Sequence, residues 1–211
     1  MAAPANTQHA APAHSAAVAP TKSASGALVL PVPYFCQRDS ATGEGLRICF
    51  SSTCAMAAAY LRPGCLAGSG QPDDQYLRLV RQFGDTTEAH AQVQALRVLG
   101  IEAELRTDGR PEQLLAQLQL GIPIPVGWLH HGPVDEPRGG GHWSLVIGWD
   151  PDTPQLVMHD PNGEADLVIG GYVRTAIGSG QALRDSERNW GRHWQVEGSG
   201  SGWWIQISTH Q

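Results

Sequence analysis

Residues 49–61 read CFSSTCAMAAAYL, and this stretch predicts the first long helix of the chain. From Ser51 onward it is rich in strong helix formers, and Pro63-Gly64 ends it. We expect Ser51, Ser52 and the residues before them to cap its first amide groups. Cys49 then lies at the start of the helix, where unpaired amides and the positive end of the helix dipole lower the pKa of a thiol.

Along the rest of the chain, most segments with helical periodicity come before most segments with an extended pattern. A short extended segment, LVLPVPYFCQ, opens the domain at Leu28. We expect helices over Asp73–Phe83, Thr86–Leu99 and Pro111–Leu120, and strands over Ile101–Arg106, Ile122–Leu129, His142–Trp149, Gln155–His159 and Trp203–Ser208. The stretch from Ser179 to Gly202 is expected to be a surface loop. The order predicts an α+β fold, with an N-terminal helical lobe packed against a C-terminal antiparallel sheet.

Length and composition limit the protein to one domain with a tail. The chain has 211 residues, of which 41% are hydrophobic and 16% charged. Its Ala/Pro/Ser-rich residues 1–26 predict a flexible arm without the basic and apolar regions of a signal peptide, and residues 27–211 form the expected domain. A net charge of -6, with only 14 scattered Lys and Arg, argues against nucleic acid as a partner. No stretch is long and apolar enough for a membrane span, so we expect a soluble protein.

Four cysteines, Cys36, Cys49, Cys54 and Cys65, lie within thirty residues of one another. They contain no CxxC pair, so neither a zinc site nor a disulfide framework is expected and free thiols are the default. Cys49 is the candidate nucleophile, although a buried inert thiol is the commoner role for a cysteine. Cys54 is the alternative nucleophile. It would lie inside the helix with its amide already bonded, and Cys36 is expected to pack.

Three further residues have the chemistry that a cysteine nucleophile needs. His142 begins an apolar strand after three glycines, and Asp160 ends the next strand before a Pro-Asn-Gly turn. If the two strands are adjacent, Asp160 can fix the tautomer of the imidazole and stabilise its charged form, although Asp-Pro-Asn-Gly is also an ordinary turn sequence. Gln37, at the end of the first extended segment, can donate to an oxyanion beside the helix start.

A metal site and a cofactor are not expected. His130 and His131 are neighbours on a predicted strand and should point to opposite faces, so they cannot easily bind one ion. Among the seven tryptophans, Trp143 follows His142 and is the one we expect to contact substrate, although most of the seven are more simply core residues.

The order Gln, Cys at a helix start, then His and Asp on successive strands resembles the papain-like cysteine peptidases. The segments VPYFCQRD, CFSSTCAMAAAYL, GGGHWSLVIGWD and HDPNGE are similar to the bacteriocin-leader-processing group, and more closely to its stand-alone phage and bacterial murein hydrolase domains, over about residues 28–207. The resemblance implies a papain-like fold in which Gln37 binds the oxyanion, Cys49 is the nucleophile, His142 is the base and Asp160 orients it. Phe50-Ser51 departs from the Gly-Pro that relatives carry after the nucleophile.

The resemblance also implies a substrate. It points to a cysteine peptidase or amidase that cleaves the peptides of bacterial cell-wall peptidoglycan. The setting would be a phage, with the N-terminal arm docked on a phage structural protein and the enzyme in the virion, or in the cytoplasm before release. Two alternatives stay open: a peptidase that removes leader peptides, and a non-catalytic binding component that retains a degenerate peptidase fold.

Overall fold

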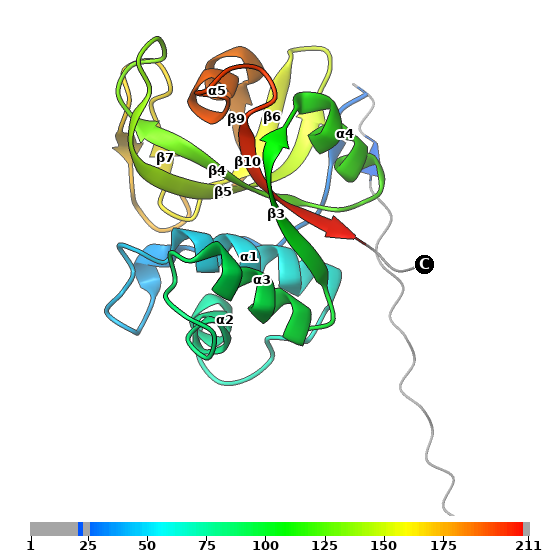
Figure 1. The fold of residues 1–211 in the computed structure, drawn as a ribbon, viewed down its shortest axis with the longest axis vertical. Helices are drawn as coiled ribbons and strands as arrows, with labels where there is room; N and C mark the ends of the chain where they lie inside the picture. The colour runs from blue at the N-terminus through cyan, green and yellow to red at the C-terminus, as the bar shows by residue number, and fades with distance from the viewer. Residues whose placement is uncertain (1–20, 23–25, 209–211) are drawn as a thin grey trace, which may run out of the picture.

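The computed structural model describes residues 21–22 and 26–208, and within them helices and strands form two parts (Figure 1). Helices α1, α2 and α3 group on one side of the sheet, and α4 and α5 lie at the other end of the view in Figure 1. The helices are the single-turn η1 (Gln37–Asp39), α1 (Cys49–Leu61), α2 (Pro72–Val80), α3 (Ala89–Val98), α4 (Pro111–Gln119) and α5 (Glu187–Trp194). The strands are β1 (Thr21–Lys22), β2 (Leu28–Val29), β3 (Glu102–Gly109), β4 (Ile124–His131), β5 (Arg138–Asp150), β6 (Gln155–His159), β7 (Glu164–Ala165), β8 (Tyr172–Arg174), β9 (Leu183–Ser186) and β10 (Gly202–Ser208).

The main sheet is antiparallel and is organised around its longest strand, β5. Its order is β1-β2-β5-β4-β10-β3, while β6 pairs with β5 and with β9. β7 and β8 form a separate two-stranded ribbon. Helices therefore come first along the chain and most of the antiparallel sheet comes later, which confirms the predicted α+β fold with a helical lobe against a sheet.

Helix α1 lies in the interior because its side chains are small. Every residue from Phe50 to Ala58 is buried, and most of these nine are Ala, Ser, Thr or Cys. A helix that is buried on all sides can approach its neighbours closely when its side chains are this short. Thr53 Oγ1 donates to the carbonyl oxygen of Trp143 at 3.0 Å and so ties the helix directly to β5.

The predicted capping of α1 is wrong. The helix begins at Cys49, and Ile48 at its N-cap makes no side-chain hydrogen bond to it. Ser52 Oγ instead donates to Asp73 Oδ2 at 2.7 Å, and the hydroxyls of Ser51 and Thr86 are hydrogen-bonded at 2.7 Å. Both serines connect α1 to neighbouring segments, so the first turn keeps the unpaired amides that stabilise negative charge.

The predicted surface loop from Ser179 to Gly202 is also wrong. Its middle forms β9 and α5, and the side chains of Trp190, His193 and Trp194 are buried. The other predicted helices and strands are present, and where they differ from the prediction they differ in their ends. β5, for example, begins at Arg138 and runs through the three glycines before His142. Gly139 among them has a φ of +101°, and a Cβ there would lie 2.5 Å from the His131 ring, so this position requires glycine.

At the N-terminus, Thr21 and Lys22 pair with Val29 and Leu28, so part of the expected arm forms β1. The rest of that arm, residues 1–20 and 23–25, lies outside the described residues. Among the described residues, every helix is too short or too polar to cross a membrane.

Candidate active site

His142 and Asp160 are hydrogen-bonded to each other in the protein interior. His142 Nε2 lies 2.9 Å from Asp160 Oδ1, and the two residues are only 4% and 3% exposed. The register of the sheet causes this meeting, because His159 at the end of β6 pairs with Leu145 of β5. Asp160 follows immediately and so lies next to the part of β5 that begins with His142. The predicted proximity of these two residues is therefore present.

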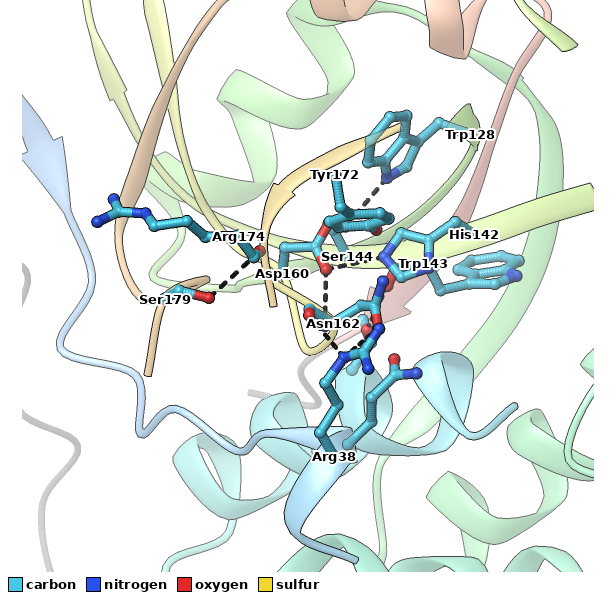
Figure 2. Close-up of polar contacts among 12 residues, drawn as sticks. Arg38, Trp128, His142, Trp143, Ser144, Asp160, Asn162, Tyr172, Arg174 and Ser179 are labelled. Atoms are coloured by element: carbon cyan, nitrogen blue, oxygen red, sulfur yellow. Dashed lines mark hydrogen bonds and ion pairs between the residues drawn. The ribbon is translucent and has the colours of Figure 1, made fainter. Parts of the chain in front are cut away.

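The Asp160 carboxylate accepts hydrogen bonds on both of its oxygens (Figure 2). Oδ1 also accepts from the backbone N–H of Asn162 at 2.8 Å. Oδ2 accepts from Ser144 Oγ at 3.2 Å and from Tyr172 Oη at 3.1 Å. Hydrogen bonds to both oxygens of this buried carboxylate fix its orientation toward the imidazole.

Trp128 completes this network from the neighbouring strand β4. Its indole N–H donates to Ser144 Oγ at 3.0 Å, and that hydroxyl in turn donates to Asp160. The indole also lies edge-on to the His142 ring, with centroids 5.5 Å apart and planes at 83°. Trp128, 5% exposed, therefore covers the imidazole and keeps water from the His142–Asp160 hydrogen bond.

Cys49 lies at the first position of α1, half-buried, and its thiol interacts with the same imidazole. Burial by itself raises the pKa of the Cys49 thiol, but the charge of His142 and a hydrogen bond from it outweigh burial, so the net pKa is lowered. Burial likewise lowers the pKa of His142, but the charges of Asp160 and Cys49 outweigh it and raise that pKa overall. The two opposite shifts favour a thiolate next to an imidazolium.

Gln37 is buried at the start of η1 and is tied to the Asp160 loop. Its backbone N–H donates to the carbonyl oxygen of Pro161 at 2.9 Å. The side-chain Nε2 donates to the carbonyl oxygen of Gly45 at 2.7 Å, and Oε1 has no hydrogen-bond partner among the described residues. The carboxamide carries a second N–H proton on Nε2. That proton is the donor that the sequence prediction assigns to an oxyanion, and the assignment stays a prediction.

The other thiols have surroundings unlike those of Cys49. Cys54 is fully buried one turn further along α1, and burial raises its pKa. Cys36 is buried as expected, and Cys65 is half-buried with a pKa that burial raises. The pKa of Cys49 is lowered whereas that of Cys54 is raised, which favours Cys49 over Cys54 as the candidate nucleophile.

Trp143 has a packing role that the sequence did not indicate. It is 8% exposed, and its ring stacks on Phe50 with centroids 3.5 Å apart. Gly127 on β4 makes room for it, since a Cβ at Gly127 would lie 2.9 Å from the indole. Phe50, which differs from the Gly expected from the sequence resemblance, is thus one half of a stacked pair. The expected contact of Trp143 with substrate stays a prediction.

The two adjacent histidines differ from the expected arrangement. His130 and His131 have ring centroids 3.9 Å apart instead of facing opposite sides, because the register of β4 on β5 shifts between Leu129 and His131. The His130 ring lies 5.2 Å from the His142 ring, and burial together with the charges of His142 and His131 lowers the pKa of His130 to about 4. His130 is therefore neutral near pH 7. Within residues 21–22 and 26–208 no cluster of three metal-ligating side chains occurs.

Comparisons with known proteins give similarity to solved structures, among them the following two. No protein-family model matches the chain, and no curated protein matches it. The peptidase domain of Streptococcus ComA, a bifunctional ABC transporter of a quorum-sensing pathway, is 19% identical with a TM-score of 0.49, over 78% of this chain and 93% of that one. A chain described as a C39-like peptidase from Bacillus anthracis is 16% identical with a TM-score of 0.48, over 87% of this chain and 98% of that one. The roles of individual residues therefore depend on the geometry of the site itself.

Proposed function

We propose that the protein is a cysteine peptidase or amidase. Cys49 is its nucleophile, His142 its general base and acid, and Asp160 the carboxylate that orients His142. The observation that carries this proposal is the position of His142, which is hydrogen-bonded to Asp160 on one side and interacts with the Cys49 thiol on the other. An ion pair of this kind supplies a thiolate at neutral pH without any other group.

The reaction follows from these positions. The Cys49 sulfur attacks the carbonyl carbon of the scissile amide, and the carbonyl oxygen becomes an oxyanion. The Cys49 amide N–H and the Gln37 side chain donate to that oxygen, each contributing about 3 kcal/mol to the transition state. The intermediate collapses when the C–N bond breaks and His142 gives its proton to the leaving amine. Water then loses a proton to His142, attacks the thioester and releases the acid and the Cys49 sulfur.

The proposed substrate is the peptide part of bacterial peptidoglycan, and the proposed setting is a phage or its host cell. The sequence resemblance to murein hydrolase domains supports both statements. Docking of the N-terminal arm on a phage structural protein belongs to the same proposal and concerns residues that are mostly outside the described structure. The chemistry itself requires only that the substrate present an amide carbonyl to Cys49.

The test is hydrolysis by purified protein. Purified peptidoglycan and a mixed peptide library are incubated with the wild type, and new amino termini are counted. Cys49→Ala should lower the rate by about three orders of magnitude or more, because it removes the covalent route. Cys65→Ala is the matched control, since Cys65 is a free thiol outside the site, and it should retain wild-type activity. Equal release by the wild type and Cys49→Ala would contradict the proposal.

A further inference from the structure

Arg38 is an exposed arginine that reaches from η1 to the loop that carries Asp160. Its Nε donates to Asn162 Oδ1 at 2.9 Å and to the carbonyl oxygen of Asn162 at 3.2 Å (Figure 2). The backbone N–H of Asn162 donates to Asp160 Oδ1, the same oxygen that lies next to His142 Nε2. The guanidinium group is therefore connected to the imidazole through only two residues.

The backbone beneath Arg38 is held in place by the same loop. Tyr34 Oη donates to the carbonyl oxygen of Asp160 at 3.0 Å, and the Gln37 amide donates to that of Pro161 at 2.9 Å. Together with the bonds from Arg38, these contacts join residues 34–38 to residues 160–162. Because both its backbone and its Nε are fixed, Arg38 presents its two terminal amino groups with less loss of side-chain entropy than an ordinary surface arginine.

Within residues 21–22 and 26–208, the charge of Arg38 has no carboxylate partner. Among the described residues it forms no ion pair, and its hydrogen bonds go to the neutral amide of Asn162. Other arginines of the chain do have acidic partners: Arg47 pairs with Asp85, Arg174 with Glu164 and Arg184 with Asp150. In a chain with a net charge of -6, an unpaired guanidinium next to the site is available for a negatively charged ligand.

We propose that Arg38 determines substrate specificity by binding a carboxylate on the leaving-group side of the scissile bond. The inference rests on the proposed peptidase function. His142 must protonate the leaving amine, and Arg38 is attached to the loop that orients His142, so the part of the substrate that leaves runs toward Arg38. A guanidinium group binds a carboxylate through two parallel hydrogen bonds. The preferred substrates are therefore peptides with a free α-carboxylate or an acidic side chain just after the cleaved bond.

The test is protection of Cys49 from alkylation, which does not depend on hydrolysis. Iodoacetamide labelling of Cys49 is followed by mass spectrometry in the presence of acetyl-trialanine, either as the free acid or as the carboxamide. The free acid should protect at a concentration at least about tenfold lower than the carboxamide, as expected for a charge-assisted hydrogen bond. An acetylated dialanyl-glutamate amide tests an acidic side chain, and succinyl-trialanine amide places the carboxylate on the acyl side.

Three variants separate charge from position. Arg38→Gln should abolish the preference for the free acid. Arg38→Lys should retain part of that preference, because lysine keeps the positive charge but lacks the two parallel N–H donors of the guanidinium group. Arg106→Gln removes a partly exposed arginine on β3, which pairs with Asp108, and should leave the preference unchanged. Equal protection by acid and amide, protection by neither, a preference that survives in Arg38→Gln, or strongest protection by the succinyl peptide would each overturn the proposal.

The same assay tests the proposed peptidase function separately from the role of Arg38. Labelling without any peptide at about pH 6 reports the Cys49 thiolate. Slow labelling there contradicts the peptidase proposal whatever the peptides do. Fast labelling of Cys49 together with equal protection by the free acid and the carboxamide contradicts only the role of Arg38.

Discussion

The ring of Phe50 lies flat on the indole of Trp143, with centroids 3.5 Å apart and planes inclined by only 4°. Phe50 follows Cys49 in α1, and Trp143 follows His142 in β5. The stacked pair therefore joins the two segments that carry the candidate thiol and imidazole. The hydrogen bond from Thr53 to the Trp143 carbonyl adds a second tie one turn along the helix. Packing between neighbours thus sets how the thiol faces the imidazole.

Replacement of Phe50 should reduce stability and activity together. Phe50→Ala leaves a cavity under Trp143 and should lower the free energy of unfolding by about 3–5 kcal/mol, and Phe50→Leu by about 1–2 kcal/mol. Urea denaturation gives these values. The folded Phe50→Leu variant should also show a lower rate of Cys49 alkylation than the wild type, because the helix start is less firmly held. If both variants unfold with the same free energy as the wild type, the stacking of Phe50 on Trp143 contributes nothing to stability.

Asp160→Asn should lower the pKa of His142. The carboxylate raises that pKa by its charge and by its hydrogen bond, so a neutral carboxamide removes the main stabilisation of the imidazolium. NMR titration of the labelled His142 ring measures the change directly. The value of kcat/KM for peptide hydrolysis should fall by about two to four orders of magnitude. If the pKa of His142 is the same in Asp160→Asn as in the wild type, Asp160 does not stabilise the imidazolium and the proposed role of Asp160 is wrong.

Tyr172→Phe should weaken the support of Asp160 without removing its charge. It deletes one of the two donors to Asp160 Oδ2 and leaves Ser144 as the other. A lost hydrogen bond of about 1–1.5 kcal/mol corresponds to about a tenfold fall in kcat/KM. Tyr60→Phe, near the C-terminal end of α1, is the matched control. The same loss in both variants would show that the effect of Tyr172 is not specific to the carboxylate.

Asp73 should make the protein less stable as pH rises from weakly acidic to neutral. Burial, and then the charges of Asp74 and Asp39, raise the pKa of Asp73 from 3.8 to about 6, although Ser52 donates to it. The folded state therefore holds this proton more tightly than the unfolded chain. Its contribution to stability is complete below about pH 4 and is lost as pH rises through the folded pKa, by up to about 3 kcal/mol.

Urea denaturation at about pH 4.5 and pH 7.5 checks this pH dependence. The difference in unfolding free energy between the wild type and Asp73→Asn isolates the carboxyl group from the other titrating residues. That difference should shift in favour of Asp73→Asn at the higher pH. A pH-independent difference would show that Asp73 titrates alike in the folded and unfolded states.

Much of the fold follows from local sequence pattern, and the exceptions have identifiable causes. The strand from Gln155 to His159 was predictable to the residue because its apolar run is bounded by turn residues. Helix α5 was not, since Gly191 and the surrounding Gly and Ser mask the spacing of Trp190 and Trp194, which are four residues apart and both buried. Ser186, which caps that helix by accepting from Asn189, was an available signal.

Within the site, the sequence predicted the residues that stand in recognisable motifs and missed those that tertiary structure brings in. His142 and Asp160 were found because both flank apolar strands. Ser144 could have been found, because it lies two residues after His142 on the same face of the strand. Tyr172 could not, since it comes from the β7–β8 ribbon and reaches Asp160 only through the path of the connecting loop.

The most direct measurement is the pH dependence of iodoacetamide alkylation at Cys49, resolved by mass spectrometry and compared with Cys65 in the same sample. A thiolate stabilised by His142 keeps Cys49 reactive well below the ordinary thiol pKa, so its rate should change little between about pH 6 and pH 8. Cys65, whose pKa is raised by burial, should react about tenfold faster with each pH unit over that range. If Cys49 follows the same steep rise as Cys65, the ion pair does not exist and the peptidase mechanism fails with it.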